Sequence, residues 1–166
     1  MKKTILFFST ILFIMLLACS GESHDLSSDN RINEKIVDDE TNNKTNSNKM
    51  ILQIGDTTLT ATLADNSSAE ALAQALSEGP ITIEMRDYGN MEKVGSLGRD
   101  FPTNNESITT EPGDIILYQG SALVIYYAPN TWNFTRLGKI DDISKEELMQ
   151  VLGKGDVTVT LSLPEE

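Results

Sequence analysis

From residue 50 onward the chain is a series of short runs in which apolar and polar residues alternate, separated by tight turns. In one of these runs Leu59, Ala61 and Leu63 alternate with threonines, a period of two that is typical of a strand with one buried face. The pattern predicts about eight strands, at 50–55, 57–64, 81–88, 92–98, 114–118, 122–127, 134–140 and 156–163. Most connections are too short for a parallel crossover, so we expect a largely antiparallel sheet.

Two segments have helical spacing instead. The first follows Ser67, which we expect to be the N-cap, with Glu70 three residues later as in a capping box. The second begins at Ser144, with Glu147 in the same relation, and ends at Gly153. Residues 99–113, between the two helical segments, read as a long irregular stretch. Acidic residues near the start of the second helix favourably meet the helix dipole, which favours a structural role for them.

Eight antiparallel strands can close into a barrel whose interior is just filled by side chains. Two amphipathic helices, one near each end of the domain, would then cover the open ends of the barrel. The predicted fold is therefore mainly β: a closed barrel of about eight largely antiparallel strands with two short capping helices.

Several strings along this segment resemble the bacterial cyclophilin-like domain family. They are "TATLADNSSAEALAQAL", "GDIILY", "LVIYY", "FTRLGKIDD" and "GDVTVTL", and the resemblance covers nearly all of 50–163. It implies the cyclophilin-type barrel. It does not imply an activity, because the family is largely uncharacterised and a fold alone does not fix a function.

Peptidyl-prolyl isomerases of the cyclophilin type carry an arginine in a Phe-His-Arg string, with a tryptophan and a histidine downstream. Here Arg86 stands in "EMRDY" and Arg99 in "LGRDF", while Trp132 stands in "NTWNF". The single histidine, His24, precedes the domain. These contexts differ from those of the isomerases, so a weak or atypical isomerase is an alternative rather than the leading prediction.

The start of the chain has the order of a secretory signal peptide. Lys2 and Lys3 precede an apolar run over 5–18, which is shorter than the roughly 20 residues that a spanning helix needs. Leu16 to Cys19 resembles the bacterial lipobox, which implies a signal peptide over 1–18 and a lipid on Cys19. This residue is the only cysteine of the chain, so it has no internal disulfide partner.

Residues 19–49 are rich in Asn, Ser, Asp and Glu and carry too little apolar surface to fold alone. We expect a lipidated N-terminus and a disordered tether, followed by one domain over 50–166. The formal net charge is −12 and becomes −14 once two of the 13 basic residues leave with the signal peptide. Such acidity excludes nucleic acid as an expected partner. Contact with the membrane would come from the lipid, on the extracytoplasmic side.

Aromatic residues gather on three consecutive segments that are expected to be neighbours in the barrel. With nearby polar residues they predict a binding pocket for a peptide or small molecule, made of Tyr118, Tyr126, Tyr127, Trp132, Asn133, Thr135 and Arg136, with Phe134 beside them. Tyr126 and Tyr127 are adjacent in a strand, so only one of them can point into the barrel.

We predict no catalytic residue, metal ligand or cofactor. The domain has no histidine or cysteine, so a nucleophile would need a lysine or carboxylate as its base. No spaced Ca²⁺ loop or dinucleotide-binding fingerprint is present. The sequence therefore favours a lipid-anchored, extracytoplasmic, non-catalytic binding module. A second alternative is an enzyme of unknown reaction that uses carboxylates and tyrosines.

Overall fold

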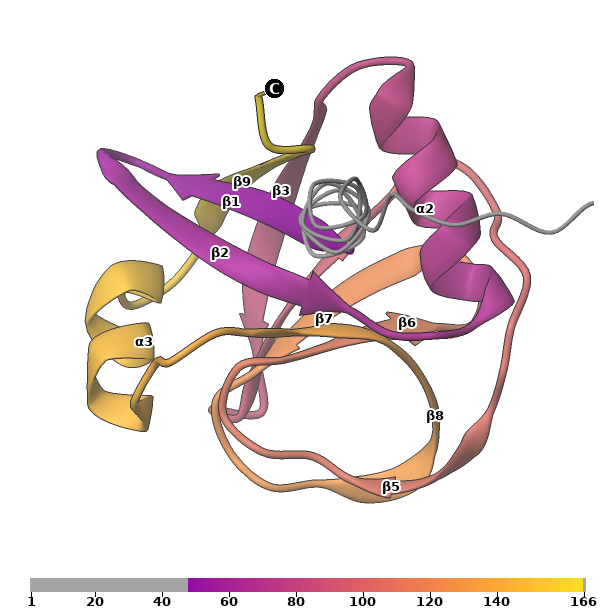
Figure 1. Ribbon diagram of the computed structural model, residues 1–166. Coiled ribbons are helices and arrows are strands. Elements are labelled where there is room, and N and C mark those ends of the chain that lie inside the picture. The colour runs from indigo at the N-terminus through magenta and orange to yellow at the C-terminus, as the bar shows by residue number, and fades with distance from the viewer. Residues whose placement is uncertain (1–47, 166) are drawn as a thin grey trace, which may run out of the picture. The chain divides into compact units, whose positions relative to one another are not determined.

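The computed structural model describes residues 48–165, which form nine strands and two helices (Figure 1). The strands are β1 (Lys49–Ile54), β2 (Thr57–Leu63), β3 (Ile81–Tyr88), β4 (Glu92–Ser96), β5 (Glu106–Thr109), β6 (Asp114–Tyr118), β7 (Ala122–Tyr126), β8 (Thr131–Ile140) and β9 (Val157–Ser162). The helices are α2 (Ser67–Ser77) and α3 (Lys145–Leu152). The predicted signal peptide, Cys19, His24 and nearly all of the predicted tether lie outside the described residues.

Eight of these strands form a closed antiparallel barrel. Their order around the barrel is β2-β1-β9-β3-β4-β7-β6-β8, and β8 pairs with β2 to complete the circle. Every pairing is antiparallel. The closed, mainly β architecture predicted from the sequence is confirmed.

The barrel closes at a glycine. Leu63 of β2 lies opposite Gly138 of β8, and a Cβ added to Gly138 would lie 2.5 Å from the carbonyl oxygen of Thr62. Real Cβ atoms do not approach a backbone oxygen so closely, so a side chain here would push the two strands apart. The absence of a side chain at Gly138 is what lets the first and last strands of the circle meet.

The ninth strand was not predicted. β5 lies within the stretch that we expected to be irregular, and it pairs with the first four residues of β8. That part of β8 begins at Thr131, three residues before the predicted start. β5 and this part of β8 form a two-stranded ribbon, the β5–β8 ribbon. Both strands of the ribbon are mostly exposed, so neither has the alternation of apolar and polar residues that marks a half-buried strand. Figure 1 shows β5 and β8 together at the lower edge of the molecule.

Both helices pack on the barrel core, and Figure 1 shows them on opposite sides of it. Leu72 and Leu76 of α2 and Leu148 and Leu152 of α3 are buried against the apolar residues of the strands. The N-cap of α2 differs from the prediction. It is Asn66 rather than Ser67, because the Asn66 side chain accepts hydrogen bonds from the amides of Ser68 and Ala69, each at 3.0 Å.

The capping box of α3 is as predicted. The Ser144 hydroxyl accepts a bond from the Glu147 amide at 3.2 Å, and the Glu147 carboxylate accepts one from the Ser144 amide at 3.0 Å. Gly153 ends the helix at φ +62°. No helix among residues 48–165 is both long enough and apolar enough to cross a membrane.

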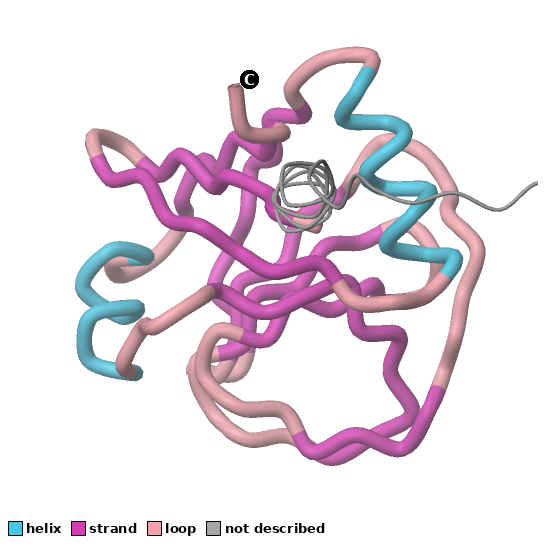
Figure 2. Tube along the Cα trace, in the orientation of Figure 1, coloured by secondary structure: helices cyan, strands magenta, loops and turns pink. Residues whose placement is uncertain are grey.

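The segment between β4 and β5 runs alongside α2 (Figure 2). The fully buried hydroxyl of Ser68 donates to the Pro102 carbonyl oxygen at 2.5 Å, and the Asn104 side-chain amide donates to the hydroxyls of Ser67 and Ser68 at 2.8 and 2.7 Å. The backbone amide of Asn104 also donates to the Thr135 hydroxyl at 2.8 Å. These bonds connect the start of α2 to β8 through a segment that has no regular structure of its own.

A buried lysine joins the end of α3 to the barrel. The Lys93 side chain is 1% exposed, and its Nζ donates to Asp87 Oδ2 at 2.8 Å and to the carbonyl oxygens of Gly153 and Gly155 at 3.1 and 2.6 Å. The Tyr127 hydroxyl donates to the same carboxylate oxygen at 3.0 Å. The hydrogen bond from Lys93 holds the pKa of Asp87 below its ordinary value. All three protons of the buried ammonium group therefore have acceptors.

Replacing Lys93 with methionine should lower the free energy of unfolding by about 3 kcal/mol at neutral pH, as expected when one partner of a buried ion pair is removed. Because the pKa of Asp87 is lowered in the folded state, its ionised form stabilises the fold above the ordinary pKa. That contribution is lost as the pH falls through the folded-state pKa. Urea denaturation of both proteins at pH 7 and about pH 2.5 should therefore show a smaller difference in acid. An equal difference at both values would contradict this assignment.

Candidate functional site

A second hydrophobic cluster lies on the outer face of the barrel, separate from the core. Its buried members come from β5, β6, β7 and β8, with Val94 of β4 packed against them, and they are Ile108, Ile116, Val124, Tyr126 and Phe134. The rings of Tyr126 and Phe134 lie 5.6 Å apart between centroids with an interplanar angle of 53°, a tilted arrangement that aromatic pairs favour. The β5–β8 ribbon thus covers part of the outer face.

Strand register brings the uncovered part of this face into rows. Glu92 of β4 lies opposite Tyr88 of β3 on one side and opposite Tyr126 of β7 on the other. In the next row Val94 lies between Arg86 and Val124. Alternate residues of a strand share a face, so β3, β4 and β7 together place a carboxylate, a guanidinium group and two tyrosines on one surface.

These rows line a hollow of about 460 Å³, which we call the aromatic groove. Its lining residues are Arg86, Tyr88, Met91, Glu92, Val94, Tyr118, Val124, Tyr126, Asn130, Trp132 and Phe134. Tyr88, Tyr118 and Trp132 are 61%, 43% and 67% exposed. Three large aromatic side chains that remain this exposed in one hollow are unusual for a surface with no binding role.

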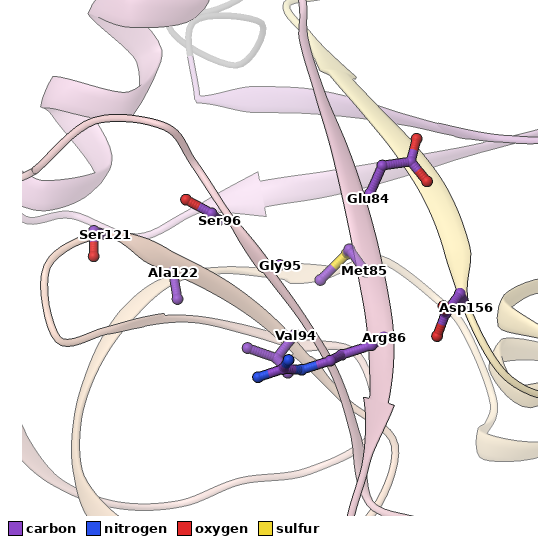
Figure 3. A pocket seen from close by; sticks show the side chains of 9 residues that line it. All are labelled: Glu84, Met85, Arg86, Val94, Gly95, Ser96, Ser121, Ala122 and Asp156. Atoms are coloured by element: carbon purple, nitrogen blue, oxygen red, sulfur yellow. The ribbon is translucent and has the colours of Figure 1, made fainter.

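A second hollow of about 400 Å³ shares two lining residues with the first, and Figure 3 shows the side chains that line it. Arg86 and Val94 line both, and Figure 3 shows the Arg86 side chain reaching from β3 toward Val94 on β4. The rest of its lining is more polar and includes Glu84, Ser96 and Ser121, with Asp156 immediately before β9. Pairing between β3 and β4 stops at Arg86 and Val94, and the hollow lies where the two strands diverge.

Burial perturbs the ionisable groups at the wall of the aromatic groove. The pKa of Glu92 is raised by burial, and a hydrogen bond with the Tyr126 hydroxyl only partly offsets this effect. Burial and the same bond raise the pKa of Tyr126. The Asn130 side-chain amide donates to the Tyr126 hydroxyl at 3.3 Å. Glu92 is therefore a partly desolvated carboxyl group, and its pKa lies above the ordinary value.

The structure brings three of the seven predicted pocket residues together. Tyr118, Tyr126 and Trp132 line the aromatic groove, as does Phe134. The other four contribute no lining to it, and each has another position or role.

Asn133 is exposed in the β5–β8 ribbon, opposite Ser107. Thr135 is fully buried and donates to Asn105 Oδ1 at 2.7 Å. Arg136 pairs with the buried Asp114 at 3.2 Å.

The two adjacent tyrosines face opposite sides of the sheet, as strand geometry requires. Tyr127 belongs to the barrel core, where burial and the bond to Asp87 raise its pKa to about 12. Tyr126 belongs to the outer cluster. Both are buried, at 5% and 3% exposure. Tyr126 therefore forms the floor of the groove, and the exposed contacts come from other rings.

Sequence reasoning missed the half of the groove that β3, β4 and the turn between them provide, including Tyr88, Met91 and Glu92. A signal was available in "ITIEMRDY", where alternation places Glu84, Arg86 and Tyr88 on the outer face. What the alternation does not reveal is that β4 joins β3 to β7. Arg99, the other arginine considered, lies outside both hollows and pairs with Glu78 at 3.4 Å.

Comparison with known proteins agrees with this architecture. Residues 52–162 match the sequence model of the cyclophilin-like family. The chain belongs to this family. No curated protein matches the chain.

Two solved structures are similar to this cyclophilin-like domain. The solution structure of a hypothetical protein from Archaeoglobus fulgidus has a TM-score of 0.52 and 13% identity, over 70% of this chain and 94% of that one. McbB in complex with tryptophan has a TM-score of 0.52 and 17% identity, over 70% of this chain and 45% of that one. At these identities the likeness shows the fold alone.

No group of three or more His, Cys, Asp or Glu side chains within residues 48–165 is placed to hold a metal ion. The aromatic groove of this cyclophilin-like domain provides broad aromatic contact, one carboxylate and one guanidinium group.

Trp132 and Tyr127 should respond oppositely to truncation. Tyr127→Ala should lower the free energy of unfolding by about 3–5 kcal/mol, because it removes a large aromatic side chain from the core. Trp132→Ala should change it by no more than about 0.5 kcal/mol, since that side chain is mostly exposed. Urea denaturation followed by circular dichroism measures both. Comparable losses would show that Trp132 is a packing residue rather than a free contact surface.

Proposed function

We propose that this cyclophilin-like protein is a non-catalytic binding module that presents its aromatic groove to a peptide or small molecule. One observation carries the proposal: Tyr88, Tyr118 and Trp132 converge, still largely exposed, on a hollow with a buried apolar floor. Amphipathic rings of this kind supply contact area and hydrogen bonds together.

The composition of the domain supports a role without catalysis. The only histidine and the only cysteine of the chain are His24 and Cys19, and both precede the domain. A serine or threonine nucleophile in the domain would therefore have no histidine as its base and would need a lysine or a carboxylate instead.

A thermal-shift screen of the purified full chain against small molecules and short peptides tests binding directly. A ligand at 100 times its Kd should stabilise the native state by about 2.7 kcal/mol. Tryptophan is a reasonable first compound, given the bound ligand of McbB. Trp132→Ala should abolish the shift of any ligand held in the groove, while Glu70→Gln on α2 serves as a control outside it. Hits that shift both variants equally would contradict a role for the groove.

The isomerase alternative is tested by a protease-coupled assay on a proline-containing peptide. We expect no acceleration over the uncatalysed rate. Because Arg86 lines the groove and Arg99 does not, the decisive variant is Arg86→Ala. Acceleration by the native chain that is lost in Arg86→Ala and retained in Arg99→Ala would replace the binding-module proposal with catalysis.

We further propose that a lipid on Cys19 holds the module on the extracytoplasmic side of the membrane. The support is the basic start, the short apolar run and the lipobox-like string that ends at this cysteine. Several acyl chains together give firm anchoring, whereas one binds only marginally.

Cys19→Ser should move the protein from the membrane fraction to the soluble fraction without changing the melting temperature of the domain. Ser20→Ala, one residue further on, should leave the protein in the membrane. Fractionation after a high-salt wash, followed by immunoblotting, distinguishes the two. If Cys19→Ser stays in the washed membrane, the lipid is not the anchor.

A further inference from the structure

We propose that the ligand of the aromatic groove is a peptide that carries a basic side chain, whose cationic group is held by the Glu92 carboxylate among the tyrosine and tryptophan rings. This inference rests on the proposed function of the same groove and names its ligand class.

Glu92 accepts a hydrogen bond from Tyr126 but has no cationic partner among residues 48–165. It is half-buried in the wall of the groove. The five ion pairs among residues 48–165 use other carboxylates, namely those of Glu78, Asp87, Glu111, Asp114 and Asp141. Tyr126 and Tyr88, its cross-strand neighbours, are uncharged. A carboxylate taken out of water without a counter-ion costs free energy, and a ligand cation would recover it.

The rings around Glu92 are suited to the same group. A cation near the face of tryptophan or tyrosine is attracted by the ring quadrupole, and the attraction grows as water is excluded. Tyr88 precedes the turn into β4 and lies directly opposite Glu92, while Tyr118 and Trp132 line the same hollow from β6 and β8. Aromatic rings combined with one carboxylate can recognise both the charge and the methylene stem of a basic side chain.

The charge balance of the two hollows also favours a cationic ligand. Their lining contains three carboxylates, those of Glu84, Glu92 and Asp156, against the single guanidinium group of Arg86. Arg86 lies within 4.0 Å of none of these carboxylates, and it stands where the two hollows meet. The formal net charge of the whole chain, −12, adds a long-range attraction for a basic partner.

The length of the site favours a peptide over a small amine. The two hollows share Arg86 and Val94 and together cross β3, β4 and the whole of β7, from Ala122 to Tyr126. A single side chain could occupy the aromatic groove without reaching the second hollow. A chain that continued past Arg86 would place polar groups beside Ser96 and Ser121, which line the second hollow.

Fluorescence of Trp132, the single tryptophan of the chain, reports on the groove directly. The probes are the peptide acetyl-Gly-Gly-Lys-Gly-Gly-amide and its norleucine counterpart, which keeps the methylene stem and lacks the charge. A second pair is choline and its neutral isostere 3,3-dimethylbutanol. We expect the lysine peptide to bind the full chain about tenfold more tightly than the norleucine peptide. Its affinity should fall with added salt.

Glu92→Gln should remove this preference, so that both peptides bind with the weak affinity of the norleucine form. Glu70→Gln, which makes the same charge change on α2, should keep it. Circular dichroism melts of both variants check that the fold is retained.

Equal binding of the lysine and norleucine peptides to the native chain would overturn the cation assignment and leave the groove as a neutral binding site. Choline binding without peptide binding would overturn the peptide assignment. If no probe changes the fluorescence at millimolar concentration, the basic-ligand inference fails, and the thermal-shift screen then decides on the groove itself.

Discussion

Closure of the sheet between β2 and β8 is the constraint on which the remaining structure depends. It requires two backbones to approach at Gly138, where a Cβ would lie 2.5 Å from the Thr62 carbonyl oxygen. Once the circle is closed there are no free edges among its eight strands, and every strand has one face inside and one outside. The interior is then filled mainly by apolar side chains, and exposed polar and aromatic groups lie on the exterior. The position of the groove on the outer face follows from this division.

The extra strand turns part of that exterior into a structured surface. Without β5 and the first residues of β8, the outer faces of β6 and β7 would expose Ile116, Val124 and Tyr126 to water. The ribbon covers them with Ile108 and Phe134, and the cover stops short of β3 and β4. The aromatic groove lies at the limit of the covered area, where buried apolar residues meet Glu92 and Arg86. This hollow therefore combines a buried apolar floor with the charged groups of Glu92 and Arg86, which form no ion pair among residues 48–165.

The features that the sequence predicted are those encoded locally. Alternation identified the eight barrel strands, and the string from Ser144 to Glu147 identified the start of α3. Local signals were ambiguous for α2, where Asn66 and Ser67 are both good N-caps and only the side-chain geometry selects Asn66. The sequence did not predict β5, because its residues are mostly exposed and show no alternation of apolar and polar side chains.

The groove was half predicted for a related reason. Tyr118, Tyr126 and Trp132 are neighbours along the chain, whereas Tyr88 and Glu92 reach them only through the β4–β7 pairing.

The alternation of inward-facing and outward-facing residues along each strand has a consequence for how such a protein can diversify. In β4, Glu92 and Val94 serve the groove while Lys93 and Gly95 serve the interior. Substitutions at every second position can therefore change the lining of the groove while the barrel stays as it is. A single-residue insertion or deletion within β4 would exchange the two sets and place a carboxylate in the core. The outer surface of this barrel can therefore change by point mutation, whereas a change in the length of a barrel strand would disrupt the core.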